Sequence, residues 1–134
     1  FGYFMEDDDN NAAALNMARV LKPAGRFFMD YLNPLNVERQ LQPETSRQSQ
    51  GFTIRERRWI DYDRKRVNKQ VVVLRDDTVV GTTSESVRMY QLEELTALLE
   101  SAGLQVSNVW GDCSGSNYDE DADRMVLAGS KAGA

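Results

Sequence analysis

The sequence of 134 residues contains no histidine and only one cysteine, Cys113. Histidine is a common zinc ligand and the side chain best suited to proton transfer near neutral pH, so its absence argues against a zinc centre and a catalytic triad. A single cysteine cannot form a disulfide within the chain. We therefore expect no metal site, and we treat Cys113 as chemically inert.

Long apolar runs and an excess of basic residues are also missing. No run approaches the roughly 20 apolar residues of a membrane-spanning helix. The formal charge of −5 argues against nucleic-acid binding, which requires a basic surface. No signal-peptide pattern is visible. We expect a cytoplasmic protein with neither a membrane nor a nucleic-acid partner, folded as a single domain over residues 1–134.

The first third of the chain predicts a helix followed by a strand. Apolar residues at helical spacing predict a helix over Asp8–Leu21, which a Pro-Ala-Gly turn ends. The run Arg26–Tyr31 is mostly apolar without alternation, a pattern typical of a parallel sheet covered on both faces. The polar stretch Leu35–Gly51 predicts a mobile connector with a short helix around Asn36–Leu41.

The middle of the chain predicts an antiparallel β-meander over residues 52–90, with one face exposed to water. Its three strand-like runs are Phe52–Tyr62, Val67–Arg75 and Thr82–Tyr90. The charged stretches Arg55–Arg58 and Asp61–Lys69 interleave opposite signs. We interpret them as solvated strand and turn surface rather than as a nucleic-acid patch.

The last third of the chain predicts a helix and two strands. Leucines at helical spacing predict a helix from Leu92 to Ala102, capped by Gly103. The strands Leu104–Trp110 and Met125–Ser130 enclose a polar loop over residues 111–123. This order of elements indicates the α/β class.

Several short motifs lie at the junctions of these elements. They are FGYF at Phe1–Phe4, ARVLKPAGRF at Ala18–Phe27, SVRMY at Ser86–Tyr90, YQLEELTALLESAGL at Tyr90–Leu104 and WGDCSGS at Trp110–Ser116. Together they resemble motifs of the class I, Rossmann-like S-adenosylmethionine (SAM)-dependent methyltransferases. The resemblance covers nearly the whole chain. Ala24 and Gln91 depart from the family's usual glycine and Ser/Thr cap, and both positions affect structure more than chemistry.

The resemblance implies that this chain is the carboxyl-terminal half of a methyltransferase acting on a small molecule. It implies a partial Rossmann-like sheet, built from the family's last strands and two helices, with the antiparallel meander inserted. The family's glycine-rich cofactor loop would lie upstream of Phe1, and no G-x-G-x-x-G pattern occurs in the sequence. The start at Phe1 rather than methionine agrees with truncation. We therefore expect the isolated chain to bind SAM weakly or not at all, and to be inactive alone.

The resemblance further implies that Phe1, Gly2, Tyr3 and Phe4 line the methyl-donor pocket, where aromatic faces suit a sulfonium cation. The alternative is that these aromatics only pack at a strand end. Methyl transfer depends on holding the acceptor in line with the methyl group. Because a base is optional for such a reaction, the catalytic residues remain unknown.

Five residues are candidates for binding the methyl acceptor. Asp30, Tyr31 and Asn33 lie at the carboxyl end of a predicted parallel strand, the edge where open α/β sheets bind ligands. The alternative for this group is that Asn33 and Pro34 form a turn and that Asp30 caps or pairs locally. Arg88 and Tyr90 alternate onto one face of the third meander strand and would bind an anionic or hydroxylated group. A solvated sheet face is the alternative for this pair.

A non-catalytic interaction or ligand-binding module is the alternative to an enzyme. A half-sheet would leave the strand Arg26–Tyr31 without a neighbour, and exposed strand edges tend to pair with other chains. We therefore expect either a homo-oligomer that forms through this sheet edge or pairing with a missing amino-terminal half. Another Rossmann-like enzyme, such as a dehydrogenase, fits the motifs less well.

Overall fold

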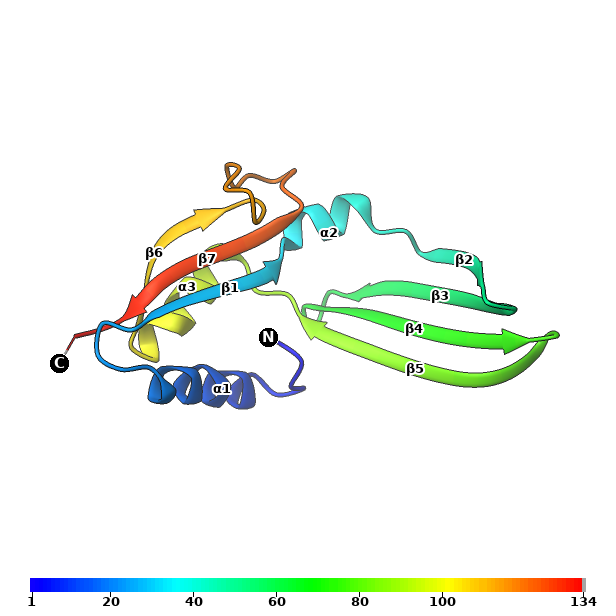
Figure 1. Ribbon diagram of the computed structural model, residues 1–134, viewed down its shortest axis with the longest axis horizontal. Helices are drawn as coiled ribbons and strands as arrows, with labels where there is room; N and C mark the ends of the chain where they lie inside the picture. The colour runs from blue at the N-terminus through cyan, green and yellow to red at the C-terminus, as the bar shows by residue number, and fades with distance from the viewer. Residues whose placement is uncertain (134) are drawn as a thin grey trace.

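The computed structural model describes residues 1–133 and places two β-sheets end to end in an elongated molecule (Figure 1). The amino terminus lies near the middle of the molecule, close to where the sheets meet. The elements in chain order are α1 (Asp7–Val20), β1 (Arg26–Leu32), α2 (Pro34–Gln40), β2 (Glu44–Ser49), β3 (Phe52–Asp61), β4 (Arg66–Arg75), β5 (Thr78–Arg88), α3 (Leu92–Ser101), β6 (Leu104–Trp110) and β7 (Arg124–Lys131).

The first sheet has three strands in the order β1-β7-β6, and both of its pairings are antiparallel. The expectation of a parallel neighbour for β1 is therefore wrong within residues 1–133. The physical reason is that β7 returns between β1 and β6, so these two run parallel to each other without touching. The second edge of β1 has no partner strand in the described part of the chain.

Helices α1 and α3 pack on one face of this sheet and enclose the core. On β1, Met29 and Tyr31 point into this core, while Phe28 points the opposite way and is 59% exposed. The prediction that β1 is covered on both faces is therefore also wrong. The buried apolar residues of the core are Ala14, Ala18, Met29, Tyr31, Tyr90, Leu95, Leu99, Leu104, Met125 and Leu127.

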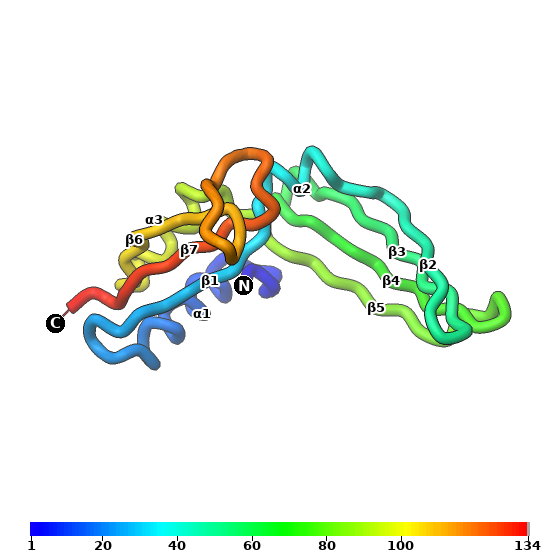
Figure 2. Tube along the Cα trace, turned by 45° about the horizontal axis from the view of Figure 1, so that its top comes forward, coloured from blue at the N-terminus to red at the C-terminus, as the bar shows by residue number. Residues whose placement is uncertain are grey.

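The second sheet is an antiparallel meander with the order β2-β3-β4-β5 (Figure 2). Strand β2 corrects the expectation of a mobile connector over Leu35–Gly51. Its sequence ETSRQS contains no apolar residue, so no hydrophobic pattern indicated a strand. An edge strand with mostly exposed side chains tolerates such a sequence, because its pairing with β3 uses only backbone groups. The short helix expected around Asn36–Leu41 is confirmed as α2.

We call residues 1–33 and 89–133 the helical lobe and residues 44–88 the meander lobe. The partial α/β sheet with an inserted antiparallel meander is confirmed. Strand β5 begins earlier than expected, at Thr78, and ends at Arg88, so Tyr90 lies beyond the strand. None of the helices in residues 1–133 combines the length and the apolar character that crossing a membrane requires.

Candidate functional site

The two lobes meet at an open cavity of about 540 Å³. The start of α1 forms one wall, and the turn between β3 and β4 forms the opposite wall. Figure 1 shows the amino-terminal segment running past this junction. The lining residues are Met5, Glu6, Asp7, Asp63, Arg64, Lys65, Arg66 and Arg88.

The loop Phe1–Phe4 is tied to the meander lobe through its backbone. The Gly2 carbonyl accepts hydrogen bonds from the Arg88 amide (2.8 Å) and from Arg66 Nη2 (3.2 Å). Gly2 has φ +87°, and a Cβ at this position would lie 3.0 Å from the Arg88 carbonyl oxygen. Only glycine combines this backbone conformation with such a close approach.

The aromatic side chains of this loop divide into two groups. Phe1 packs against the core, with its ring centroid 6.1 Å from that of Tyr90. Tyr3 and Phe4 are 60% and 55% exposed. Packing at a strand end therefore describes Phe1, whereas Tyr3 and Phe4 present free aromatic faces.

Arg66 lies at the first position of β4 and is only 2% exposed. It donates to the Phe4 carbonyl (3.0 Å), and its other partners are the Gly2 carbonyl and both oxygens of Ser86. The interpretation of Asp61–Lys69 as solvated surface is therefore wrong at this position. The charged residues around Arg66 made it look like exposed turn surface in the sequence. Its pairing opposite Arg88 on β5 is the feature that places it at the lobe junction.

Arg88 and Tyr90 are buried at the same junction, which rules out a solvated sheet face for them. Arg88 is 9% exposed, and its Nε donates to Asp7 Oδ1 at 3.1 Å. Its guanidinium lies 4.5 Å above the Tyr90 ring, in cation–π contact. The Tyr90 hydroxyl donates to the same oxygen of Asp7 at 3.3 Å. Burial raises the pKa of Tyr90 above its usual value, so this hydroxyl stays protonated.

Tyr31 links the two lobes from inside the core. It is 2% exposed, its hydroxyl donates to the Arg88 carbonyl, and the same oxygen accepts from the Tyr90 amide at 2.9 Å. Burial also raises the pKa of Tyr31. The hydroxyl thus fixes the chain where it leaves β5 for α3.

Asp30 and Asn33 point away from the cavity. Asp30 forms a half-exposed ion pair with Arg124 (2.8 Å) on the face of the sheet opposite Tyr31. Asn33 is 1% exposed, and its amide donates to the Asp119 and Ala122 carbonyls at 3.0 and 2.8 Å. The Tyr118 hydroxyl donates to Asn33 Oδ1 at 3.1 Å. Of the residues at the end of β1, only Tyr31 therefore reaches the lobe junction.

The residues present suit one side of SAM. The exposed rings of Tyr3 and Phe4 offer π faces for a sulfonium cation, and Phe4 lines a separate open hollow along α1. A glycine-rich loop for the nucleotide part is not found in the sequence. Within residues 1–133, no cluster of histidine, cysteine or acidic residues is arranged to hold a metal ion.

No family model and no curated protein matches the sequence. Solved structures do match the fold. The methyltransferase CcbJ from Streptomyces caelestis matches with a TM-score of 0.81 and 18% identity, over 98% of this chain and 56% of its own. A SAM-dependent methyltransferase from Clostridium acetobutylicum matches with a TM-score of 0.82 and 15% identity, over 99% of this chain and 55% of its own.

An amino pentose methyltransferase from Micromonospora echinaspora, solved with SAM bound, matches with a TM-score of 0.62 and 17% identity. The match covers 98% of this chain and 54% of that enzyme. The chain thus spans a little over half the length of the solved structures it matches. Over 98–99% of its length, this chain has the fold of part of a SAM-dependent methyltransferase.

Proposed function

We propose that this chain is the substrate-side, carboxyl-terminal half of a SAM-dependent methyltransferase that acts on a small molecule. The observation that carries the proposal is the match of 98–99% of the chain to solved methyltransferases. Residues 1–134 would form one domain with the meander 52–90 as an insertion. One matched enzyme acts on an amino pentose, which supports a small polar acceptor.

In this proposal the loop Phe1–Phe4 faces the methyl donor. Tyr3 and Phe4 supply exposed aromatic faces, and Gly2 permits the close approach of the loop to β5. When bound, SAM would supply the electrophilic methyl group. Arg66 would act as a positioning residue, because it holds the carbonyls of Gly2 and Phe4.

The acceptor would bind in the cavity between the lobes. Asp7 holds Arg88 and Tyr90 in place, and burial keeps the Tyr90 hydroxyl protonated. Tyr90 would therefore hold Arg88 and Asp7 in position beside the acceptor rather than remove a proton from it. Tyr31 would contribute by fixing Tyr90. Asp30 and Asn33 would have no direct contact with the acceptor in this cavity, and Asn33 would instead fix the loop 111–123 at the end of β1.

The proposal is tested by calorimetric titration of the isolated chain with S-adenosylhomocysteine. We expect weak or undetectable binding, because the residues present contact only one side of the cofactor. Tight one-to-one binding would show that this chain holds a complete cofactor site, which contradicts the division into halves. If weak binding is seen, Tyr3→Ala should reduce it, because the proposal assigns the Tyr3 ring to the methyl-donor side.

A second candidate function is an interaction module that oligomerises through its sheet edge. The unpaired edge of β1 and the exposed Phe28 favour it, since a free strand edge next to apolar surface is a template for strand pairing. Size-exclusion chromatography with light scattering separates the cases. A dimer that Phe28→Lys dissociates supports edge pairing, and a monomer at micromolar concentration excludes it.

A further inference from the structure

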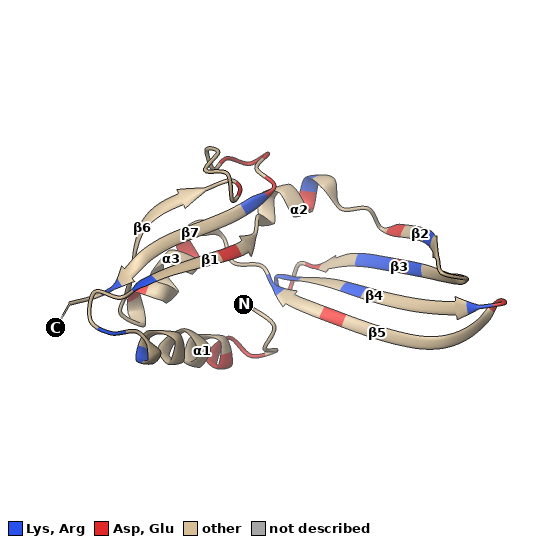
Figure 3. Ribbon diagram, in the orientation of Figure 1, with Lys and Arg blue, Asp and Glu red and all other residues tan. Residues whose placement is uncertain are grey.

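Charge is distributed unevenly between the lobes (Figure 3). Residues 44–88 contain ten of the 16 lysine and arginine residues but only seven of the 21 aspartate and glutamate residues. The meander lobe therefore carries +3 and the rest of the chain −8, against the total of −5. A basic lobe on an acidic protein creates a local potential that attracts anions.

Arg66 is a buried cation without a carboxylate partner. Its four hydrogen bonds go to the Ser86 hydroxyl and to three backbone carbonyls, all of them neutral. Within residues 1–133, no carboxylate lies within ion-pair distance of it. Burying a charge is costly unless an opposite charge compensates it. An anion in the adjoining cavity would supply this compensation.

Arg88 lines the same cavity with an unused donor. Its Nε binds Asp7, and its Nη1 donates to the Met89 carbonyl at 2.6 Å and lies 3.7 Å from Glu94 Oε2. For Nη2, no hydrogen bond is found among the described residues, although the side chain is only 10% exposed. The free N–H groups of Nη2 suit one oxygen of a phosphate or carboxylate group.

The amino end of α1 opens into the cavity as well. The capping residue Glu6 forms no side-chain hydrogen bond to the first turn, although Asp7, Asp8 and Asp9 in that turn offset part of the positive end of the helix dipole. Three carboxylates in the lining oppose an anion. Asp7 is already bound by Arg88 and Tyr90, however, and Glu6 and Asp63 are exposed to water, which screens them.

We propose that this cavity binds an anionic group of the methyl acceptor, either a phosphate or a carboxylate. Arg88 is the direct ligand, and Arg66 is the buried positive charge beside it. Arg64 and Lys65 line the exposed side of the cavity, and its volume of about 540 Å³ leaves room for more of the acceptor than the charged group. The inference rests on the proposed function and narrows its substrate to acceptors that carry a negative charge.

The test is an NMR titration of the whole chain with inorganic phosphate and, separately, with acetate at constant ionic strength. We expect saturable shifts at the amides of Asp7 and Lys65 for at least one anion. The tighter anion identifies the acceptor group as phosphate or carboxylate. Arg88→Gln should weaken this binding at least about tenfold, which corresponds to about 1.4 kcal/mol.

Arg47→Gln is the matched control. Arg47 is exposed on β2 and does not line the cavity, so this substitution removes one positive charge at a site away from the cavity. It should change the affinity less than about twofold. If Arg88→Gln does not fold, the exposed Arg64→Gln variant replaces it, with an expected loss of about threefold. No saturable binding of either anion up to about 50 mM, or equal losses in the cavity and control variants, would overturn the proposal. The NMR titration contains no cofactor, so its failure can be told apart from a failure of the S-adenosylhomocysteine titration.

Discussion

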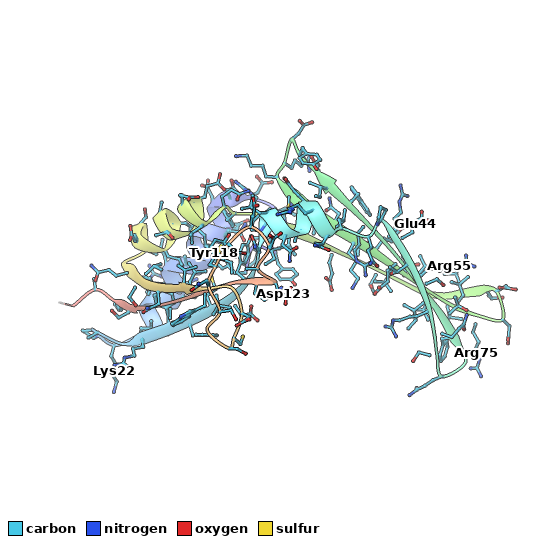
Figure 4. The ribbon with its side chains drawn as sticks, turned by 90° about the horizontal axis from the view of Figure 1, so that it is seen from above. Lys22, Glu44, Arg55, Arg75, Tyr118 and Asp123 are labelled. Atoms are coloured by element: carbon cyan, nitrogen blue, oxygen red, sulfur yellow. The ribbon has the colours of Figure 1, made fainter. Side chains whose placement is uncertain are left out.

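The helical lobe and the meander lobe are held together by different interactions. The helical lobe buries a continuous apolar core between one sheet face and two helices. In the meander lobe, by contrast, Leu74 is the only buried apolar side chain on β2–β5, and the other buried residues there are Arg66 and Arg88. Figure 4 shows the side chains of the meander extending from both faces of its sheet.

This difference indicates that the meander lobe depends on backbone pairing and on its attachment to the helical lobe. Antiparallel pairing satisfies its backbone groups, but half-exposed side chains contribute less apolar burial per residue. The attachment is polar and buried, through Arg66, Arg88 and Tyr31. We infer that the meander is a projecting arm whose position relative to the core is set by these few contacts.

The largest expected effect concerns the core itself. Leu99 on α3 is completely buried, so Leu99→Ala should lower the free energy of unfolding by about 3 kcal/mol through lost burial and a new cavity. Val71 on β4 is half-buried, and Val71→Ala should cost about 1 kcal/mol. Urea-induced unfolding measures both values. Equal losses would contradict the difference between the lobes and would indicate that something covers the meander in solution.

A smaller effect is expected where the lobes join. Tyr31→Phe removes the hydroxyl that bridges the Arg88 carbonyl and the Tyr90 amide, and it leaves both groups buried without this partner. The loss of stability should be about 2 kcal/mol, with faster hydrogen exchange at the Tyr90 amide.

The control for this variant is Tyr62→Phe, because Tyr62 is 67% exposed at the end of the meander. Its effect should stay below about 0.5 kcal/mol. If exchange at Tyr90 is unchanged in Tyr31→Phe, the hydroxyl does not fix the junction and the attachment lies elsewhere.

The smallest effect concerns an ion-pair cluster on the meander. Lys69, Arg58 and Thr45 bind the Glu56 carboxylate and hold its pKa below the usual value of 4.5. A lowered pKa in the folded state stabilises the fold above the unfolded-state pKa, and this contribution is lost as the pH falls through the folded-state pKa.

Unfolding midpoints measured from about pH 6 down to pH 3 test this effect. Glu56→Gln should be less stable at pH 6 and should lose less stability on acidification than the unchanged chain. Parallel pH curves for the two proteins would show that the cluster contributes nothing measurable, as is common for exposed ion pairs.

Much of the fold could be predicted because its signals are local. Helix α3 follows from the spacing of its leucines, and β6 has the predicted bounds Leu104–Trp110. Strand β2 could not be predicted, since a polar edge strand has no hydrophobic pattern to read. The antiparallel pairing of β1 depends on β7, nearly a hundred residues away along the chain, and no local pattern specifies it.

The candidate site was predictable only in part. The sequence singled out Gly2, Arg88 and Tyr90 one by one, but their contact at the lobe junction joins segments almost ninety residues apart, which no motif specifies. Arg66 was missed because its neighbours Arg64 and Lys65 are exposed and the whole run has the composition of a turn. Asn33 faces the loop 111–123, where its amide donates to two backbone carbonyls. Its position at the end of a strand did not identify this loop as its partner.

The most direct test of the central claim is whether this chain completes a cofactor site. It can be joined to the part of the Clostridium acetobutylicum methyltransferase that it does not cover, and the folded chimera titrated calorimetrically with S-adenosylhomocysteine. We predict one-to-one binding, weakened at least about tenfold by Gly2→Val, which would displace the donor-side loop. A folded chimera that does not bind S-adenosylhomocysteine would contradict the assignment of this chain as half of a methyltransferase.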